Sequence, residues 1–187
     1  MDLGSSVCTL GGVGAAHKFH TRNRDAGAPV PAPDDRGTPH ILWPNFHSGA
    51  NGDCQRIYPV GDIHPVLRDA SQPDGIIGYL PAHPHEGAVI APLEDSTARV
   101  IATGLSKASG DRFNITVAFE PSRTGGPALA QSTFHHFADY NWDPARGCPD
   151  FVTEAPGDGM GTTPLAMPSV HRYVRNVALW LAGRLDT

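Results

Sequence analysis

The sequence predicts a mixed α/β domain in which helices pack on a sheet, and three observations lead to this fold class. Two consecutive strand-like segments, residues 113–120 and 127–134, are joined by the turn SRTGG. Shorter runs rich in β-branched residues precede them, and residues 169–182 have the period of an amphipathic helix. A chain of 187 residues suffices for one domain with a substantial core, so residues 1–187 are interpreted as a single domain.

The segment FNITVAFE alternates in the manner of a half-buried strand. One face of this strand would carry Phe113, Ile115, Val117 and Phe119, and the other Asn114, Thr116, Ala118 and Glu120. Residues 127–134 follow a Gly-Gly turn and would pair with it as a hairpin. Earlier strands are expected at 76–81, 88–92 and 98–104, with a short helical piece that His64 and Pro65 introduce.

The last segment, SVHRYVRNVALWLAG, predicts a helix that closes the fold. Ser169 is the expected N-cap and Gly183 the expected stop. Apolar residues recur at three- and four-residue steps and would pack on the sheet: Val170, Tyr173, Val174, Val177 and Leu181.

Residues 21–58 are rich in Pro, Gly, Asn and Asp and lack a sustained period of 2 or 3.6. They predict a long ordered loop, with a short strand at 40–43. The whole chain holds 21 Gly and 18 Pro, which indicates many turns and loops, and loops carry functional sites more often than regular elements do.

Charge, hydropathy and cysteine spacing indicate which classes of partner and which cellular compartment to expect. A net charge of -5 with scattered Lys and Arg leaves no basic stripe for a phosphate backbone, so we expect no nucleic-acid partner. Apolar runs stay short of the ~20 residues that a bilayer span needs, so we expect no membrane partner. Cys8, Cys54 and Cys148 are widely spaced, which fits a reducing compartment, so we expect a cytoplasmic protein.

Three segments in order, FNITVAFE, GGPALAQSTFHHF and RYVRNVALWLAG, resemble the end of ThuA-like domains of the class I glutamine amidotransferase-like superfamily. The segments HPVLRD and YLPAHPHEG extend the resemblance, which covers about residues 59–183. It implies an α/β fold with a flavodoxin-like three-layer sheet, a C-terminal β-hairpin and a closing helix.

The stretch DLGSSVC resembles the helix that follows the nucleophile elbow in this superfamily. The resemblance implies that the chain begins after the elbow and is the C-terminal part of a larger domain, incomplete at the N-terminus. Cys8 would lie several residues past the elbow, as a small buried residue, so covalent amidotransferase chemistry is disfavoured. A sheet without its first strands would leave the chain poorly stable or prone to associate.

The motif HPHEG places His83 and His85 on one face if the backbone is extended, with Glu86 opposite. Two imidazoles could then converge on one metal ion or one substrate hydroxyl. The alternative is a polar loop in which the histidines cap backbone groups.

The motif HHFADYNW follows the last predicted strand, where His135 and His136 would point to opposite sides. The ThuA-like topology would bring this motif and HPHEG together at the sheet end where ligands bind. Asp139, Asn141 and Trp142 would add polar groups and a flat ring. The alternative is that the aromatic residues of the motif only cover the sheet edge.

The leading hypothesis is a hydrolase-like ThuA-like domain that binds or acts on a small polar molecule, a carbohydrate derivative. Histidine acid–base chemistry is assigned to His85, His135 and His136. The ligand-binding candidates are His83, Glu86, Asp139, Asn141 and Trp142. A divalent metal at His83, His85 and His135 is the candidate cofactor, and Asn51, Asp53 and Gln55 are further candidates from the long loop. The rival hypothesis is a non-catalytic module for ligand binding or protein association, with a homo-oligomer as one form of that association.

Overall fold

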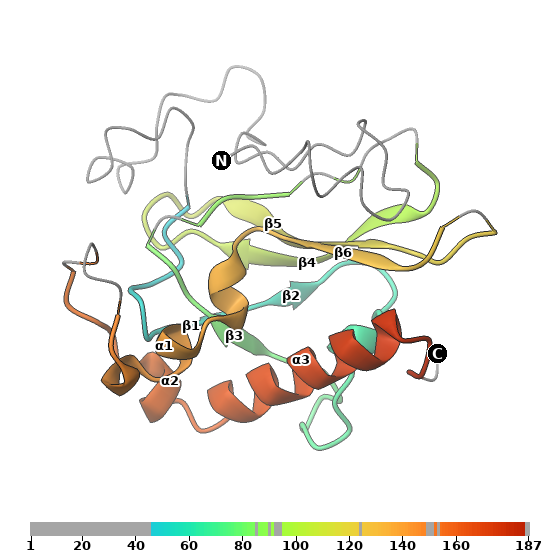
Figure 1. Ribbon diagram of the computed structural model, residues 1–187. Helices are drawn as coiled ribbons and strands as arrows, with labels where there is room; N and C mark the ends of the chain where they lie inside the picture. The colour runs from blue at the N-terminus through green and yellow to red at the C-terminus, as the bar shows by residue number, and fades with distance from the viewer. Residues whose placement is uncertain are drawn as a thin grey trace.

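The computed structural model describes residues 46–84, 86–89, 91, 95–123, 125–148, 152 and 154–185. The described chain is mixed α/β, with two antiparallel sheets and several helices (Figure 1). The larger sheet has the order β2-β4-β5-β6, with β2 at Tyr58–Pro59, β4 at Ala98–Leu105, β5 at Arg112–Phe119 and β6 at Ala128–Gln131. The smaller one pairs β1 (Cys54–Arg56) with β3 (Tyr79–Pro81).

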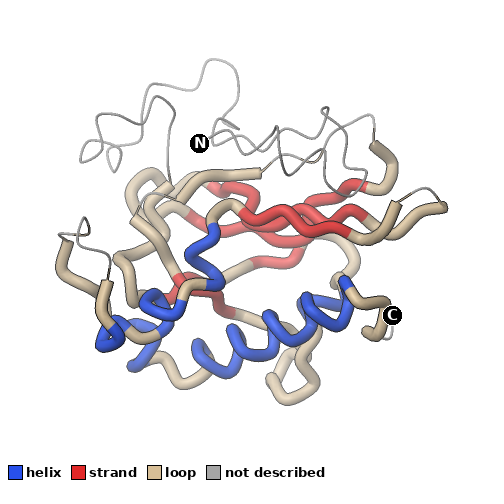
Figure 2. Tube along the Cα trace, in the orientation of Figure 1, coloured by secondary structure: helices blue, strands red, loops and turns tan. Residues whose placement is uncertain are grey.

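Helix α3 (Ala166–Leu181) runs along one side of the larger sheet (Figure 2). Its side chains Tyr173, Val177 and Trp180 share a buried core with Phe113 and Ile115 of β5. The shorter helices are η2 (Pro65–Leu67), η3 (Phe134–Phe137), α1 (Asp139–Trp142), η4 (Pro144–Arg146) and α2 (Gly159–Thr162). Within the described ranges, these helices all fall short of the length and apolar character that crossing a membrane requires.

The predicted C-terminal hairpin is confirmed, because β5 and β6 pair antiparallel from Thr116↔Gln131 to Phe119↔Ala128. Strand β6 ends earlier than expected. Thr133 adopts an extended backbone and its side chain accepts a hydrogen bond from the His135 backbone N–H, which starts the 3-10 helix η3. The two histidines therefore lie on a helical turn, and the strand geometry predicted for them is wrong.

The alternation predicted for β5 is also wrong in its second half. Phe113 and Ile115 lie in the core shared with α3, whereas Val117 and Phe119 pack with Val89 in a separate cluster. The β4–β5 register is irregular at this point, where Ala102 faces Thr116 and Thr103 faces Asn114. An irregularity of one residue exchanges the two faces of a strand. As a result, Thr116 points toward α3, where its hydroxyl group lies 3.5 Å from that of Tyr173.

The closing helix is confirmed, with changes at both ends. It begins at Ala166, so Ser169 lies inside it and is not the N-cap. Trp180 is buried, whereas Leu181 is 44% exposed, so Leu181 was wrongly assigned to the core. Gly183 ends the helix as expected: its φ is 65°, its N–H bonds Trp180 O, and the Arg184 N–H bonds Leu179 O, which is a Schellman end.

Of the other predicted strands, helices and loops, some are confirmed and some are wrong. Strands are confirmed within 76–81 and 98–104, and His64 caps η2 by accepting a hydrogen bond from the Val66 N–H. Residues 88, 89 and 91 are not a strand. The loop predicted for 21–58 is wrong at Cys54–Arg56 and Tyr58, which pair in strands; residues 21–45 lie outside the described part.

The structure thus shows the general fold class, mixed α/β, and not the flavodoxin-like arrangement. Every strand pair among the described residues is antiparallel, whereas a flavodoxin-like sheet is parallel in its main part. The stretch DLGSSVC, on which the expectation of an incomplete N-terminus depends, lies outside the described residues, as does Cys8.

Candidate functional site

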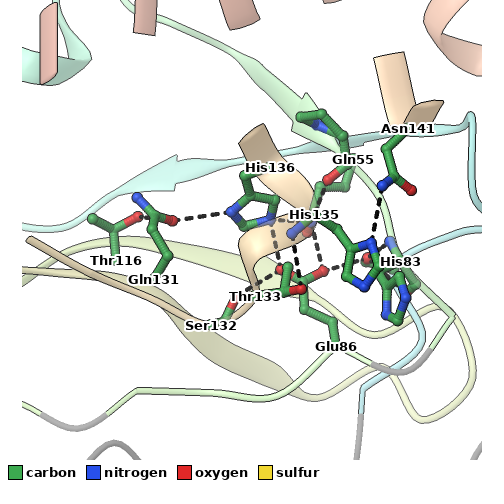
Figure 3. A network of polar contacts seen from close by, with 12 residues as sticks. Gln55, His83, Glu86, Thr116, Gln131, Ser132, Thr133, His135, His136 and Asn141 are labelled. Carbon is green, nitrogen blue, oxygen red and sulfur yellow. Dashed lines mark hydrogen bonds and ion pairs between the residues drawn. The ribbon is translucent and has the colours of Figure 1, made fainter. Parts of the chain in front are cut away.

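The HPHEG and HHFADYNW segments meet (Figure 3), but not at one sheet end as the resemblance led us to expect. HPHEG follows β3 of the smaller sheet, and HHFADYNW follows β6 of the larger one. His83 follows β3 and His135 lies in η3, and their rings stack with centroids 3.8 Å apart and planes 20° apart. Beneath them, Glu86 contacts His136. His85, which was predicted to be catalytic, lies outside the described residues.

Glu86 is fully buried, and its carboxylate accepts four side-chain hydrogen bonds. Oε1 accepts from His136 Nε2 at 2.9 Å and from Ser132 Oγ at 2.7 Å. Oε2 accepts from Ser48 Oγ at 2.5 Å and from Gln55 Nε2 at 2.6 Å. Burial alone would raise the pKa of Glu86, but the nearby His136 and these hydrogen bonds hold it below its ordinary value. The carboxylate is therefore an ionised anchor for the segments around it.

His136 is also fully buried and connects the anchor to the closing helix. Its Nδ1 lies 3.0 Å from Gln131 Oε1. Gln131 also contacts the hydroxyl groups of Thr116 and Tyr173, so the polar network reaches α3. Tyr173 is buried, and this burial raises the pKa of its hydroxyl far above the ordinary value.

His135 differs from His136 because it is partly exposed. The Asn141 side-chain amide lies 2.9 Å from its Nδ1, and the Phe134 ring stacks on it at 4.2 Å between centroids. Burial and, to a smaller extent, the nearby His136 lower the pKa of His135 to about 4, although Glu86 opposes the shift. The ring is therefore neutral at pH 7.

Of the other predicted site residues, Trp142 and Asn141 support the fold and Asp139 lies at the surface. The Trp142 indole Nε1–H donates to His136 O at 3.1 Å, and the ring packs with Met160 and Val170. Asn141 is fully buried, whereas Asp139 is exposed at the start of α1. The flat face predicted for Trp142 is thus engaged in packing, and the exposed ring beside His135 is Phe134, whose exposed fraction is 71%.

Several members of the network were not predicted. Ser48, Ser132, Gln131, Thr116 and Tyr173 carry no motif that distinguishes them from solvated residues. Gln55 was a candidate only as part of the long loop, where Asn51 and Asp53 were grouped with it. In the structure Gln55 reaches Glu86, while Asp53 accepts backbone hydrogen bonds from Ala50 and Gly159.

The stacked pair is not arranged to hold a metal ion. Imidazole lone pairs lie in the ring plane, so two nearly parallel rings 3.8 Å apart cannot both point at one ion ~2.0–2.1 Å away. Within the described ranges, no group of three His, Cys, Asp or Glu side chains could hold a metal.

Two histidines should make the fold sensitive to acid. His64 is buried against Trp180, with Nε2 3.2 Å from Glu120 Oε1; burial lowers its pKa to about 4 although Glu120 opposes this. His64 and His135 both bind a proton more readily when unfolded, where the ordinary pKa is 6.5. The stability that they contribute is complete above pH 6.5 and is lost as the pH falls toward 4.

We expect the free energy of unfolding, measured with urea at pH 7, 6, 5 and 4.5, to fall steadily as the pH decreases. The variant His64→Leu should show a shallower fall, since one of the two histidines no longer titrates. A constant free energy of unfolding across this range would contradict the prediction.

No protein-family model, curated protein or solved structure matches the chain.

Proposed function

We propose that this chain is a ThuA-like domain that binds or acts on a small polar molecule, a carbohydrate derivative, with His135 as the residue that contacts it. The observation that carries the proposal is the stack of His83 and His135, partly open to solvent, next to the fully hydrogen-bonded Glu86. A rigid, satisfied polar layer behind an accessible ring is how binding groups are held in fixed geometry.

The division of labour between the two histidines supports this proposal. Glu86 and His136 are both buried and contact each other at 2.9 Å, so they hold the site together and do not touch a ligand. His135 has one ring nitrogen bound by Asn141 and the other without a hydrogen bond among the described residues. Any histidine acid–base chemistry on the ligand would therefore pass through His135, with Phe134 as the neighbouring apolar face that a sugar ring can cover.

The test is binding of neutral sugars to the full chain. In ¹H–¹⁵N spectra, titration with glucose, galactose, maltose and lactose should shift the backbone signals of Thr133 and His135 with at least one sugar. His135→Ala should then lower the affinity for that sugar at least tenfold, which is about 1.4 kcal/mol, because the ring that contacts the sugar is removed.

His171→Ala is the matched control, since His171 is an exposed histidine on α3 whose ring contacts Trp142 at 5.9 Å between centroids, on a ring that is engaged in packing. It should keep the affinity of the unmodified chain. If no sugar shifts the Thr133 region, or if His135→Ala binds as tightly as the control, the proposed function is wrong.

A second candidate function, a non-catalytic module for protein association, is favoured by one observation. Phe134 and Phe137 are 71% and 38% exposed on the short helix η3. Exposed aromatic side chains of this kind are typical of association surfaces. If no sugar binds and sedimentation of the chain depends on concentration, Phe134→Ser should weaken the association.

A further inference from the structure

Asn141 contacts His135 in a way that fixes where the imidazole proton lies. The Asn141 amide Nδ2 is 2.9 Å from His135 Nδ1 (Figure 3). An amide NH₂ group only donates, so Nδ1 accepts and carries no proton of its own. In a neutral imidazole the single proton must then lie on Nε2.

The surroundings of His135 keep the ring neutral and its Nε2 available. His83 and Phe134 stack on the ring at 3.8 and 4.2 Å, both nearly parallel to it, and two such rings fit only on opposite faces. The covered faces, together with burial, disfavour a second proton. Nε2 has no hydrogen-bond partner in the described chain, and it is not among the unpaired nitrogen and oxygen atoms found sealed from solvent there.

Asn141 itself is held firmly enough to impose this state. It is fully buried in α1, the helical turn directly after η3, and its backbone N–H bonds Ala138 O. The neighbouring Trp142 fastens the same turn by donating to His136 O at 3.1 Å. The Asn141 Oδ1 is buried without a hydrogen-bond partner among the described residues, so the contact of Nδ2 with His135 is the hydrogen bond that orients the amide.

We propose that Asn141 is a positioning residue that holds His135 as the Nε2–H tautomer, so that the site presents a hydrogen-bond donor and takes ligands through an acceptor oxygen. The inference rests on the proposed function, in which His135 contacts the ligand. It narrows the ligand class to molecules that offer a hydroxyl, ether or carbonyl oxygen. It also means that Nε2 cannot remove a proton from the bound molecule, because Nε2 already carries one.

The tautomer can be measured without a ligand. In the ¹⁵N-labelled full chain at pH 7, a long-range ¹H–¹⁵N correlation separates the protonated from the unprotonated ring nitrogen of each histidine. We expect His135 to have a protonated Nε2 and an unprotonated Nδ1. The opposite assignment in the unmodified chain would overturn the proposal without any variant.

Two variants test the role of Asn141. Asn141→Asp replaces the donor by an acceptor of the same shape, so the proton should move to Nδ1, with or without retention at Nε2. Asn141→Leu removes the contact, so a mixture of tautomers is expected. The signals of buried His136 serve as the internal control for folding; if a variant with unchanged His136 signals keeps the pure Nε2–H form, Asn141 does not set the tautomer.

The same spectra distinguish this inference from the proposed function. If His135 is the Nε2–H tautomer but no sugar perturbs the site, the proposed function fails and the tautomer assignment stands. If a sugar binds and His135 proves to be the Nδ1–H form, the proposed function stands and the inference fails.

Discussion

Replacing His136 with leucine should lower the free energy of unfolding by about 3–5 kcal/mol, because the change leaves the buried Glu86 carboxylate without the partner that contacts its Oε1. Both side chains are 0% exposed, so water cannot replace the lost contact at 2.9 Å. Ser48, Gln55 and Ser132 would remain as donors, but only Ser132 would be left for Oε1. Urea unfolding at pH 7, followed by circular dichroism, measures the effect.

Two controls separate the loss of the Glu86–His136 contact from the general effect of replacing a histidine by leucine. His171→Leu makes the same change at an exposed position of α3 and should stay within about 0.5 kcal/mol of the unmodified chain. The double variant Glu86→Leu/His136→Leu should cost less than the sum of the two single variants by at least ~1 kcal/mol, since it removes both buried partners together. A loss under about 1 kcal/mol for His136→Leu would contradict a stabilising contact between Glu86 and His136.

The resemblance led us to expect that the two histidine segments meet, but at one sheet end, whereas they follow strands of different sheets. Neither the resemblance nor the motifs gave the roles of the residues inside the site. HPHEG and HHFADYNW were recognisable because they concentrate imidazole and aromatic groups. Which histidine is sealed and which is open depends on the 3-10 turn that Thr133 starts, and a single Thr before an apolar residue is a weak signal. Glu86 was expected to point away from His83, as it would on an extended strand. Its partner His136 is 50 residues away in the sequence, so the HPHEG motif alone could not indicate the contact.

The β5 strand illustrates why the rest of the fold could not be predicted. The alternation in FNITVAFE is real in the sequence, but the irregular register opposite β4 reverses the faces between Ile115 and Thr116. A register irregularity depends on the partner strand, which the local sequence does not contain. The closing helix was predictable because its period and its Gly183 stop are local. Its start at Ala166 and the burial of Trp180 in place of Leu181 were missed.

A glycine in the long predicted loop holds the backbone that supports the site. Gly52 has a φ of 89°, which side-chain-bearing residues rarely adopt, and its carbonyl accepts a hydrogen bond from Met160 N. A Cβ at this position would overlap Pro144 Cγ and would lie 2.6 Å from Gly157 O. Since the second atom belongs to the backbone, the clash cannot be relieved by turning a side chain.

We therefore expect Gly52→Ala to lower the free energy of unfolding by roughly 2–5 kcal/mol, as backbone strain of ~1–2 kcal/mol adds to a packing clash of ~1–3 kcal/mol. Two other glycines separate these contributions in the same urea measurement. Gly61 has a positive φ of 64° with nothing within 4 Å of where a Cβ would lie, so Gly61→Ala should show the strain alone. Gly78 has neither feature, so Gly78→Ala should be nearly neutral or slightly stabilising.

The effect of Gly52→Ala should also reach the candidate site. The segment that contains Gly52 carries Ser48, a donor to Glu86, so a displaced backbone there would disturb the surroundings of the His136 ring. The ring signals of His136 should therefore shift in Gly52→Ala and stay unchanged in Gly61→Ala. Equal losses of stability for these two variants would show that the close approach of Pro144 and Gly157 does not constrain the fold.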